Sequence, residues 1–285
     1  MNLEGAFVVA RPADEVWAAL NDPAVLARAI PGRSGRAAEG SAVVSRLGNA
    51  GGSARDNAVI GEVLQGNIPD FLRNLVPVTF TGSVNTGMHV MQAAARNITN
   101  VTLELGGKSP VVVLADADLE HTVEEVVWAI NSNAGQVCSA GSRLVIEKSI
   151  HGEFMERLVN RTKALSIGHG LRGKDVSAIN SQMQVDKISD FVKDARARGL
   201  EIATGGNPTH DPETGKGFFF EPTIVNNVAA DDRLVQEEIC GPELSVQVAD
   251  DFDHALALAN GTDFGLMSAI FTRDLSKAHR FIRHG

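Results

Sequence analysis

Sulfur is scarce in this 285-residue chain, whose only cysteines are Cys138 and Cys240, and tyrosine is absent. Two cysteines cannot form a disulfide framework, which excludes a small disulfide-stapled scaffold and favours a reducing, cytoplasmic compartment. The chain also lacks an apolar run near the roughly 20 residues that span a bilayer. Residues 1–4 include an acid, and the apolar stretch at 7–10 is too short for the core of a signal peptide. We therefore expect neither a membrane span nor a secretory signal.

Basic residues are in deficit, because 26 lysines and arginines face 35 aspartates and glutamates and the formal net charge is −9. A chain with this balance does not attract nucleic acid or anionic lipid, so neither partner is expected. What is present is an ordinary globular composition, with 44% hydrophobic and 21% charged residues. A chain of this length and composition buries a sizeable core and is typical of a soluble metabolic protein.

The sequence pattern divides the chain into unequal pieces. Residues 1–32 predict a short strand followed by a helix, and residues 33–57 are rich in Gly, Ala, Ser and Arg, which indicates a linker. From about residue 58 onward, strand patterns alternate with helix patterns. Such alternation predicts a layered α/β fold with parallel sheets.

Individual elements can be placed along this second part of the chain. The run at 111–115 is continuously apolar, which is the mark of a buried parallel strand, and Asp116 after it is expected to cap a helix. Other strands are expected at 76–80, at 101–105, near 202, near 246 and at 267–271. Helices are expected after 83, after 116 and at 154–165, 184–198, 253–260 and 275–282.

The first chemical candidate is the turn at Gly82 and Ser83, which leads from a strand into a helix. Gly82 allows backbone to approach a ligand closely, and the free amides at the helix start attract an anion such as pyrophosphate. Most strand–glycine–helix turns are merely structural, so this motif needs support from the rest of the chain.

The second candidate is Glu104, on an apolar strand that is followed at once by Gly106 and Gly107. A carboxylate there is either paired in the core or lies at the carboxyl end of the strand, where α/β proteins place their sites. Burial would raise its pKa and suit it to act as a general base that activates water. A salt-bridged strand residue is the competing interpretation.

The third candidate is Cys138, in a turn of small residues between a helix pattern and a strand. A solitary cysteine is most often an inert buried filler. A turn with glycines at 135 and 141 can instead expose the sulfur and direct backbone amides at a developing oxyanion. The thiolate is the reactive form, so such a nucleophile needs a lowered pKa or a nearby base. The functional interpretation is preferred because the three motifs occur together.

Taken in order, these motifs resemble the aldehyde dehydrogenase superfamily from about residue 78 to the C-terminus. The similarity rests on 80–83 with Gly87, 103–110, 135–138, 237–242, 264–266 and 270–272. It implies a remnant of a Rossmann-like cofactor domain at 58–106 and a catalytic α/β domain with a parallel sheet at 107–285. The family's known length implies that this chain is truncated at both ends.

The resemblance also implies roles for single residues. Cys138 would attack the aldehyde carbon, and Glu104 would activate the water that releases a carboxylic acid. Gly82 and Ser83 would lie against the pyrophosphate of NAD or NADP, Gly106 would lie near the nicotinamide, and Glu238 would hold the ribose hydroxyls. Residues 133 and 136, Asn and Gln, would shape the turn without a catalytic role. No metal is implied, and the family forms dimers or tetramers.

Departures from the family pattern leave two other hypotheses open. The asparagine that completes the family's oxyanion hole has no counterpart in residues 1–77, and its loss costs roughly 100- to 1000-fold in rate by analogy with other acyl-transfer sites. Cys240 stands where the family usually has phenylalanine. The chain could thus be a catalytically impaired subunit or binding partner. Residues 1–32 resemble the start of helix-grip proteins related to an accessory component of carbon monoxide dehydrogenase, which suggests a small hydrophobic-ligand module as the third hypothesis.

Overall fold

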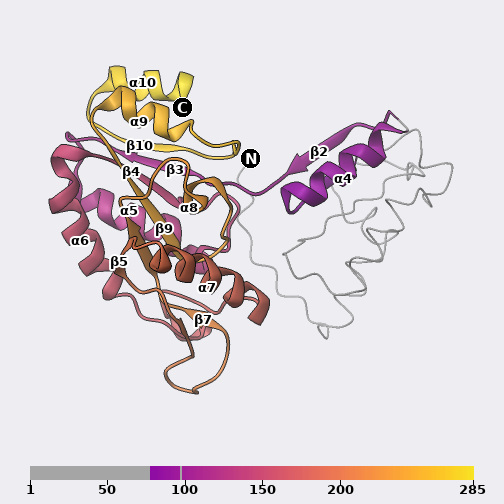
Figure 1. The fold of residues 1–285 in the computed structure, drawn as a ribbon, viewed down its shortest axis with the longest axis horizontal. Coiled ribbons are helices and arrows are strands. Elements are labelled where there is room, and N and C mark those ends of the chain that lie inside the picture. The colour runs from indigo at the N-terminus through magenta and orange to yellow at the C-terminus, as the bar shows by residue number, and fades with distance from the viewer. Residues whose placement is uncertain (1–77, 97) are drawn as a thin grey trace, which may run out of the picture. The chain divides into compact units, whose positions relative to one another are not determined.

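The computed structural model describes residues 78–96 and 98–285 (Figure 1). The expectations for 1–32, for the linker at 33–57 and for the chain up to 77 lie outside these residues. The described chain falls into two compact units, which we treat separately. One contains 78–81 and Asn85–Leu103, and the other contains Gly82–Val84 and Glu104–Gly285. The predicted domain bounds stay a prediction.

The smaller unit is built on strand β1 (Val78–Thr81), helix α4 (Val84–Ala95) and strand β2 (Val101–Glu104), where the sequence predicts strand, helix and strand. The amide of Val78 donates to the carbonyl of Asn100, and four residues further along each segment Gly82 donates to Glu104. Equal steps in the same direction mean that β1 and β2 run parallel. On α4, Val90 and Ala94 are buried, whereas Met91, which belongs to the same apolar pattern, is 55% exposed.

The larger unit is organised around a six-stranded sheet in the order β10-β3-β4-β9-β8-β5. Its strands are β3 (Pro110–Val113), β4 (Arg143–Glu147), β5 (Glu201–Thr204), β8 (Thr223–Asn226), β9 (Glu243–Ala249) and β10 (Ala269–Phe271). All neighbours are parallel except β5, which is antiparallel to β8. The predicted α/β fold class is confirmed, and the sheet is mixed only at this edge.

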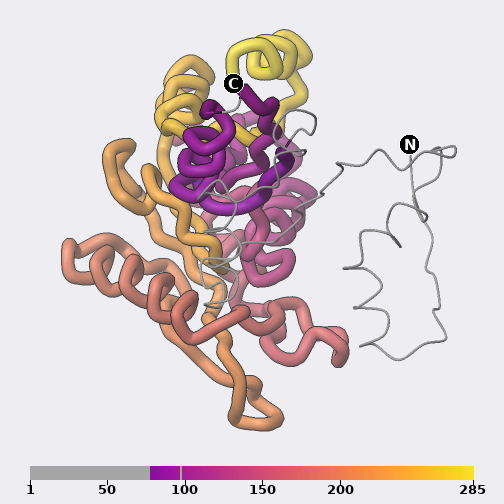
Figure 2. The backbone as a smooth tube through the Cα atoms, turned by 90° about the vertical axis from the view of Figure 1, so that its right-hand side faces the viewer, coloured from indigo at the N-terminus to yellow at the C-terminus, as the bar shows by residue number. Residues whose placement is uncertain are grey.

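Helices cover both faces of this sheet (Figure 1). They are α5 (Leu119–Asn131), α6 (His151–Lys163), α7 (Gln182–Ala197), α8 (Arg233–Gln236), α9 (Phe252–Ala259) and α10 (Leu275–His284). Short 3₁₀ turns occupy Ser132–Gly135, Lys148–Ile150 and Gly170–Arg172. The small hairpin of β6 (Pro208–Thr209) and β7 (Phe219–Phe220) carries a loop that projects from the unit in two views (Figures 1 and 2).

Alternation along the central strands separates the core into layers. Val111 and Leu144 pack with Phe154 and other residues of α5 and α6, whereas Val112 and Val145 pack with α9 and α10. A third cluster lies between α7 and β8. Because successive side chains of a strand point to opposite faces, this is the packing of a sheet buried on both sides.

The N-terminal cap of α5 differs from the expectation. Asp118, two residues after Asp116, is the cap and accepts a hydrogen bond from the amide of His121. Asp116 instead accepts hydrogen bonds from the hydroxyl of Thr272 and the amide of Arg273, next to strand β10. Both aspartates are compatible with a helix start, so only the neighbouring chain decides between them. No helix of the described residues is long and apolar enough to cross a membrane.

The starts of three adjacent strands are aligned by register. Pro110 of β3 pairs with Arg143 of β4, and Arg143 pairs with Ser245 of β9. A buried ion pair joins the outer two of these starts, because Lys108 Nζ lies 3.3 Å from Glu243 Oε2 and the side chains are 1% and 0% exposed. Arg143 Nε donates to the carbonyl of Lys108 at 2.8 Å. The segments that enter β3, β4 and β9 are therefore held together.

Charge in this buried cluster is tuned by its surroundings. Burial lowers the pKa of Lys108 and raises that of Glu243, and the attraction between the two groups opposes both shifts. Burial also lowers the pKa of Arg143 to about 10. The guanidinium donates to the carbonyls of Leu258 and Ala259 at the C-terminal end of α9, where the helix dipole favours a cation.

We predict that Lys108→Met lowers the free energy of unfolding by about 3–5 kcal/mol, because it leaves a buried carboxylate without a partner. The double variant Lys108→Met/Glu243→Leu should lose less, since it removes both charges. Lys148→Met is the matched control: its pair with Asp250 is 73% and 70% exposed, and exposed pairs contribute only about 0–1 kcal/mol. Urea unfolding measures all three, and equal losses for Lys108→Met and Lys148→Met would contradict the role of the pair.

Candidate active site

Three chain segments meet where β3, β4 and β9 begin: 106–109, 138–142 and 238–242. A Cβ on Gly107 would lie 2.7 Å from the backbone carbonyl oxygen of Cys138. Real side chains do not approach so closely, so glycine is the residue that allows the first segment to pack on the second. The structure thus brings Gly107 and Cys138, 31 positions apart, into contact.

The same glycine pair meets the third segment. A Cβ on Gly106 would clash with the carboxylate of Glu238, and the amide of Gly107 donates a hydrogen bond to that carboxylate. Burial raises the pKa of Glu238, while Lys187, the Gly107 amide and Lys108 favour the charged form. Of the predicted site residues, Cys138, Gly106 and Glu238 are therefore brought together.

An unusual backbone leads to the cysteine. After α5, three consecutive residues adopt left-handed φ angles of 50°, 53° and 69°, at Asn133, Ala134 and Gly135. For alanine this conformation costs about 1–2 kcal/mol, and Ala134 is fully buried. At Gly135 a side chain would clash with the carbonyl of Gly241. The strained turn is thus packed directly against the segment that carries Glu238.

Cys138 lies on the predicted turn. The amide of Ala140 donates to the carbonyl of Val137 at 3.0 Å, which closes a β-turn with Cys138 and Ser139 at its centre. Cys138 is exposed. The sulfur is therefore not sealed in the interior, which excludes the inert-filler interpretation and leaves it accessible to a reactant.

Gln136 fixes the turn from outside. Its side-chain Nε2 donates to the carbonyl of Ala178 at 3.1 Å, and its Oε1 accepts from the amide of Asn180 at 2.9 Å. Asn133 Nδ2 donates to the carbonyl of Gln136. The prediction that these two amides shape the turn is confirmed, and neither needs a catalytic role for this.

Helix α7 holds the segment that carries Glu238, by means of residues that the sequence does not reveal. Lys187 Nζ donates to the carbonyl of Glu238 at 2.8 Å, and Gln184 Nε2 donates to the carbonyls of Ile239 and Cys240 at 2.7 and 2.9 Å. Their spacing of three places both on one side of the helix. That spacing is the only sequence signal they carry, and most pairs at this spacing are surface residues.

A small pocket lies between these segments. Its lining combines Gly107 with residues of the cysteine turn and of the third segment: Gly135, Val137, Ala140, Ser142, Glu238, Ile239, Cys240, Gly241 and Glu243. Cys240 adopts a left-handed φ of 60°. Burial, with the nearby charge of Glu238, raises the pKa of the Cys240 thiol to about 11.

Glu104 is the last residue of β2, and its backbone carbonyl accepts the amide of Gly82 at 3.0 Å. Its side chain is exposed, so the expectation that burial tunes this carboxylate is wrong, and the alternative of a strand-end position holds. Gly82 and Ser83 lie between β1 and the first turn of α4, as the sequence predicts. The catalytic and cofactor roles of all these residues stay proposals.

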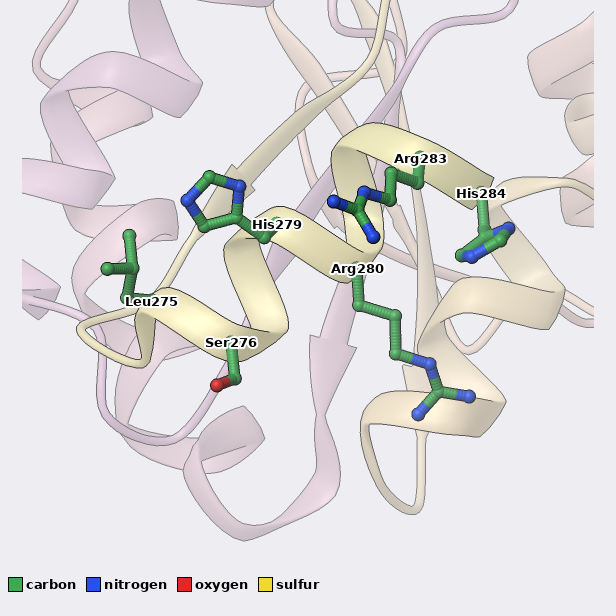
Figure 3. A pocket seen from close by; sticks show the side chains of 6 residues that line it. All are labelled: Leu275, Ser276, His279, Arg280, Arg283 and His284. Carbon is green, nitrogen blue, oxygen red and sulfur yellow. The ribbon is translucent and has the colours of Figure 1, made fainter.

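A separate pocket lies on α10 (Figure 3). It is lined by Leu275, Ser276, His279, Arg280, Arg283 and His284. None of the predicted site residues belongs to it, and its lining comes from one helix. In the described part of the chain, no group of three or more His, Cys, Asp and Glu side chains is placed to hold a metal ion.

The two thiols should react at different rates, because Cys138 is exposed and Cys240 is partly buried with a pKa of about 11. At pH 8 a thiol with that pKa is only about one-thousandth thiolate, which is the reactive form. We predict that iodoacetamide modifies Cys138 at least about 100-fold faster than Cys240. Peptide mass spectrometry over time measures both rates, and the chain in urea, where the rates should become similar, is the control. Equal rates in the folded chain would refute the assignment.

Comparison with known proteins identifies relatives for most of the described chain. Residues 72–284 match the aldehyde dehydrogenase family. The chain is 41% identical over 204 residues to betaine aldehyde dehydrogenase of Bacillus subtilis (strain 168), a match that covers 71% of this chain and 42% of that protein. It is 38% identical over 227 residues to 4-trimethylaminobutyraldehyde dehydrogenase A of Danio rerio, with 79% of this chain and 45% of that protein covered.

A solved structure agrees. The structure of betaine aldehyde dehydrogenase from Staphylococcus aureus in complex with NAD⁺ superposes with a TM-score of 0.71 at 37% identity, and the match covers 75% of this chain and 43% of that one. The chain thus spans less than half the length of these relatives. The match to the family begins at residue 72, so it does not include 1–32. The chain belongs to the aldehyde dehydrogenase family.

Proposed function

We propose that the chain oxidises an aldehyde to a carboxylic acid with NAD or NADP, with Cys138 as nucleophile and Glu104 as general base. The observation that supports this best is the meeting of an exposed cysteine turn with the Gly106–Gly107 pair and Glu238, in a member of the aldehyde dehydrogenase family. A cysteine buried away from these residues would have removed the proposal.

Cys138 supplies the nucleophile. Its thiolate adds to the aldehyde carbon, and the carbonyl oxygen becomes an oxyanion that backbone amides of the turn can stabilise. The fixed turn supports this role, because Gln136 and the strained residues before it leave the sulfur exposed while the backbone is held. Loss of the aldehyde hydrogen as hydride then leaves a thioester on Cys138.

The residues around Gly106 fit a dinucleotide. Gly106 has no side chain, and a Cβ there would fill the space next to the Glu238 carboxylate, which is the group proposed to accept ribose hydroxyls. Gly82 and Ser83 precede a helix start, where free amides favour a pyrophosphate. When bound, the nicotinamide cofactor supplies the hydride acceptor. In the relative from Staphylococcus aureus the bound dinucleotide is NAD⁺.

Glu104 is proposed to take the proton of the water that attacks the thioester. Three peptide steps separate it from Gly107, so its Cα lies within about 11 Å of the glycine that touches the Cys138 carbonyl. Its exposure leaves the side chain free to rotate toward that point. Attack by the activated water then releases the carboxylic acid and returns the thiol.

The relatives suggest a substrate class. Both curated relatives are named for aldehydes of trimethylated amines, betaine aldehyde and 4-trimethylaminobutyraldehyde. We therefore propose small aldehydes that carry a trimethylammonium group as the first substrates to test. The expectations of homo-oligomers, of a cytoplasmic location and of no nucleic-acid or membrane partner stay predictions.

The test is NADH formation with betaine aldehyde, followed by absorbance at saturating NAD⁺. Cys138→Ser should lower the rate by a factor of about 1000 or more, because it removes the nucleophile. Glu104→Gln should lower the steady-state rate by about 100- to 10,000-fold and leave a burst of one NADH per chain, since only thioester hydrolysis is impaired. Glu120→Gln, on the exposed side of α5, is the matched control and should match the unmodified chain.

Two results would contradict the proposal. NADH formation that persists in Cys138→Ser would remove the nucleophile assignment. A folded chain that forms no NADH with betaine aldehyde or with a panel of simpler aldehydes would favour the impaired subunit or binding partner instead.

A further inference from the structure

Both cysteines of the chain lie at the same pocket. Cys240 is part of its lining, as are Val137, which precedes Cys138, and Gly107, which packs against the Cys138 carbonyl. The sequence contains no third cysteine. Two thiols that are 102 positions apart are thus the only ones in the chain and border one space.

The segments that carry the two thiols are in direct contact. A Cβ on Gly135 would clash with the carbonyl of Gly241, three residues before Cys138 on one side and one residue after Cys240 on the other. The two backbones therefore touch at this point. The charge of Cys138 also acts on Cys240, which is consistent with their proximity.

The two cysteines differ in accessibility and in how they are held. Cys138 is exposed at the centre of a β-turn, so an oxidant in solution reaches it first. Cys240 is partly buried, and Gln184 fixes its carbonyl from α7. Its left-handed φ of 60° is uncommon for a residue with a side chain. One thiol is therefore placed to be oxidised, and the other is placed behind it.

We propose that Cys138 and Cys240 form a reversible oxidation site that responds to hydrogen peroxide. The Cys138 thiol is oxidised by one peroxide to a sulfenic acid, and one water is released. The Cys240 thiol then attacks the Cys138 sulfur, its proton leaves with the hydroxyl as a second water, and a disulfide forms. A thiol reductant reverses the step by exchange.

The structure indicates what this disulfide does. A disulfide requires Cα atoms within about 7 Å, and the exposed turn, rather than the segment clamped by α7, is the part that can adjust. The bond would cross the pocket beside Gly107 and Glu238. It would also protect Cys138 from further oxidation to sulfinic acid, which reductants do not reverse.

The experiment treats the reduced full chain, at low micromolar concentration, with hydrogen peroxide. Remaining thiols are blocked with N-ethylmaleimide, and the tryptic peptides are analysed by mass spectrometry without reduction. The expected result is a linked peptide pair containing Cys138 and Cys240, the loss of both thiols per chain, and the return of both after treatment with dithiothreitol. Cys240→Ala should instead give sulfinic acid at Cys138 that dithiothreitol does not restore, and Cys240→Ser serves the same purpose if the alanine variant does not fold.

Sulfinic acid at Cys138 with a free Cys240 thiol in the unmodified chain would overturn the proposal. Links only between Cys138 residues of two chains would do the same. The readout is mass rather than activity, so it is separate from the proposed function. A linked pair in a chain without dehydrogenase activity would support the oxidation site while the proposed function fails.

Discussion

The register of three parallel strands determines the candidate site. β3, β4 and β9 begin side by side, and the buried pair of Lys108 and Glu243 joins the first and third across the start of the second. Breaking such a pair leaves a charge without solvent or partner, which makes the arrangement costly to disturb. The glycine pair, the cysteine turn and the Glu238 segment are the chain immediately upstream of these strands. Their convergence therefore follows from the register.

The site differs from the usual arrangement of α/β proteins in its direction. Ligands of open parallel sheets commonly bind at the carboxyl ends of the strands, and Glu104 at the end of β2 fits that rule. Cys138 and Glu238 instead precede their strands, β4 and β9. Residues before a strand have no sheet partners, so their positions depend on side-chain clamps such as those of Gln136 and Lys187. This explains why small residues and strained backbone gather here.

Much of this could be predicted from the sequence because the signals are local. The continuous apolar run at 111–115 indicated a buried parallel strand, and the glycine-rich stretch around Cys138 indicated an exposed turn. The family motifs indicated the fold and the order of the site residues. These features depend on residues close in sequence, or on motifs that occur in a recognisable order.

The rest depends on contacts between distant residues. Nothing near Lys108 shows that its partner is Glu243, and nothing on α7 shows that Lys187 meets the Glu238 carbonyl. The cap of α5 fell on Asp118 rather than Asp116 because Thr272 and Arg273, far along the chain, engage the first aspartate. Glu104 is exposed although apolar residues flank it, since burial depends on what packs against the end of β2.

The most direct measurement of the central claim, that the register brings the glycine pair against the cysteine turn, is the alkylation rate of Cys138 in Gly107→Ala. The new Cβ would lie 2.7 Å from the Cys138 carbonyl oxygen, so the turn must shift, and we predict a several-fold change in the rate. Gly152→Ala, where a Cβ meets nothing within 4 Å, should leave the rate unchanged. An unchanged rate in a folded Gly107→Ala chain would contradict the account.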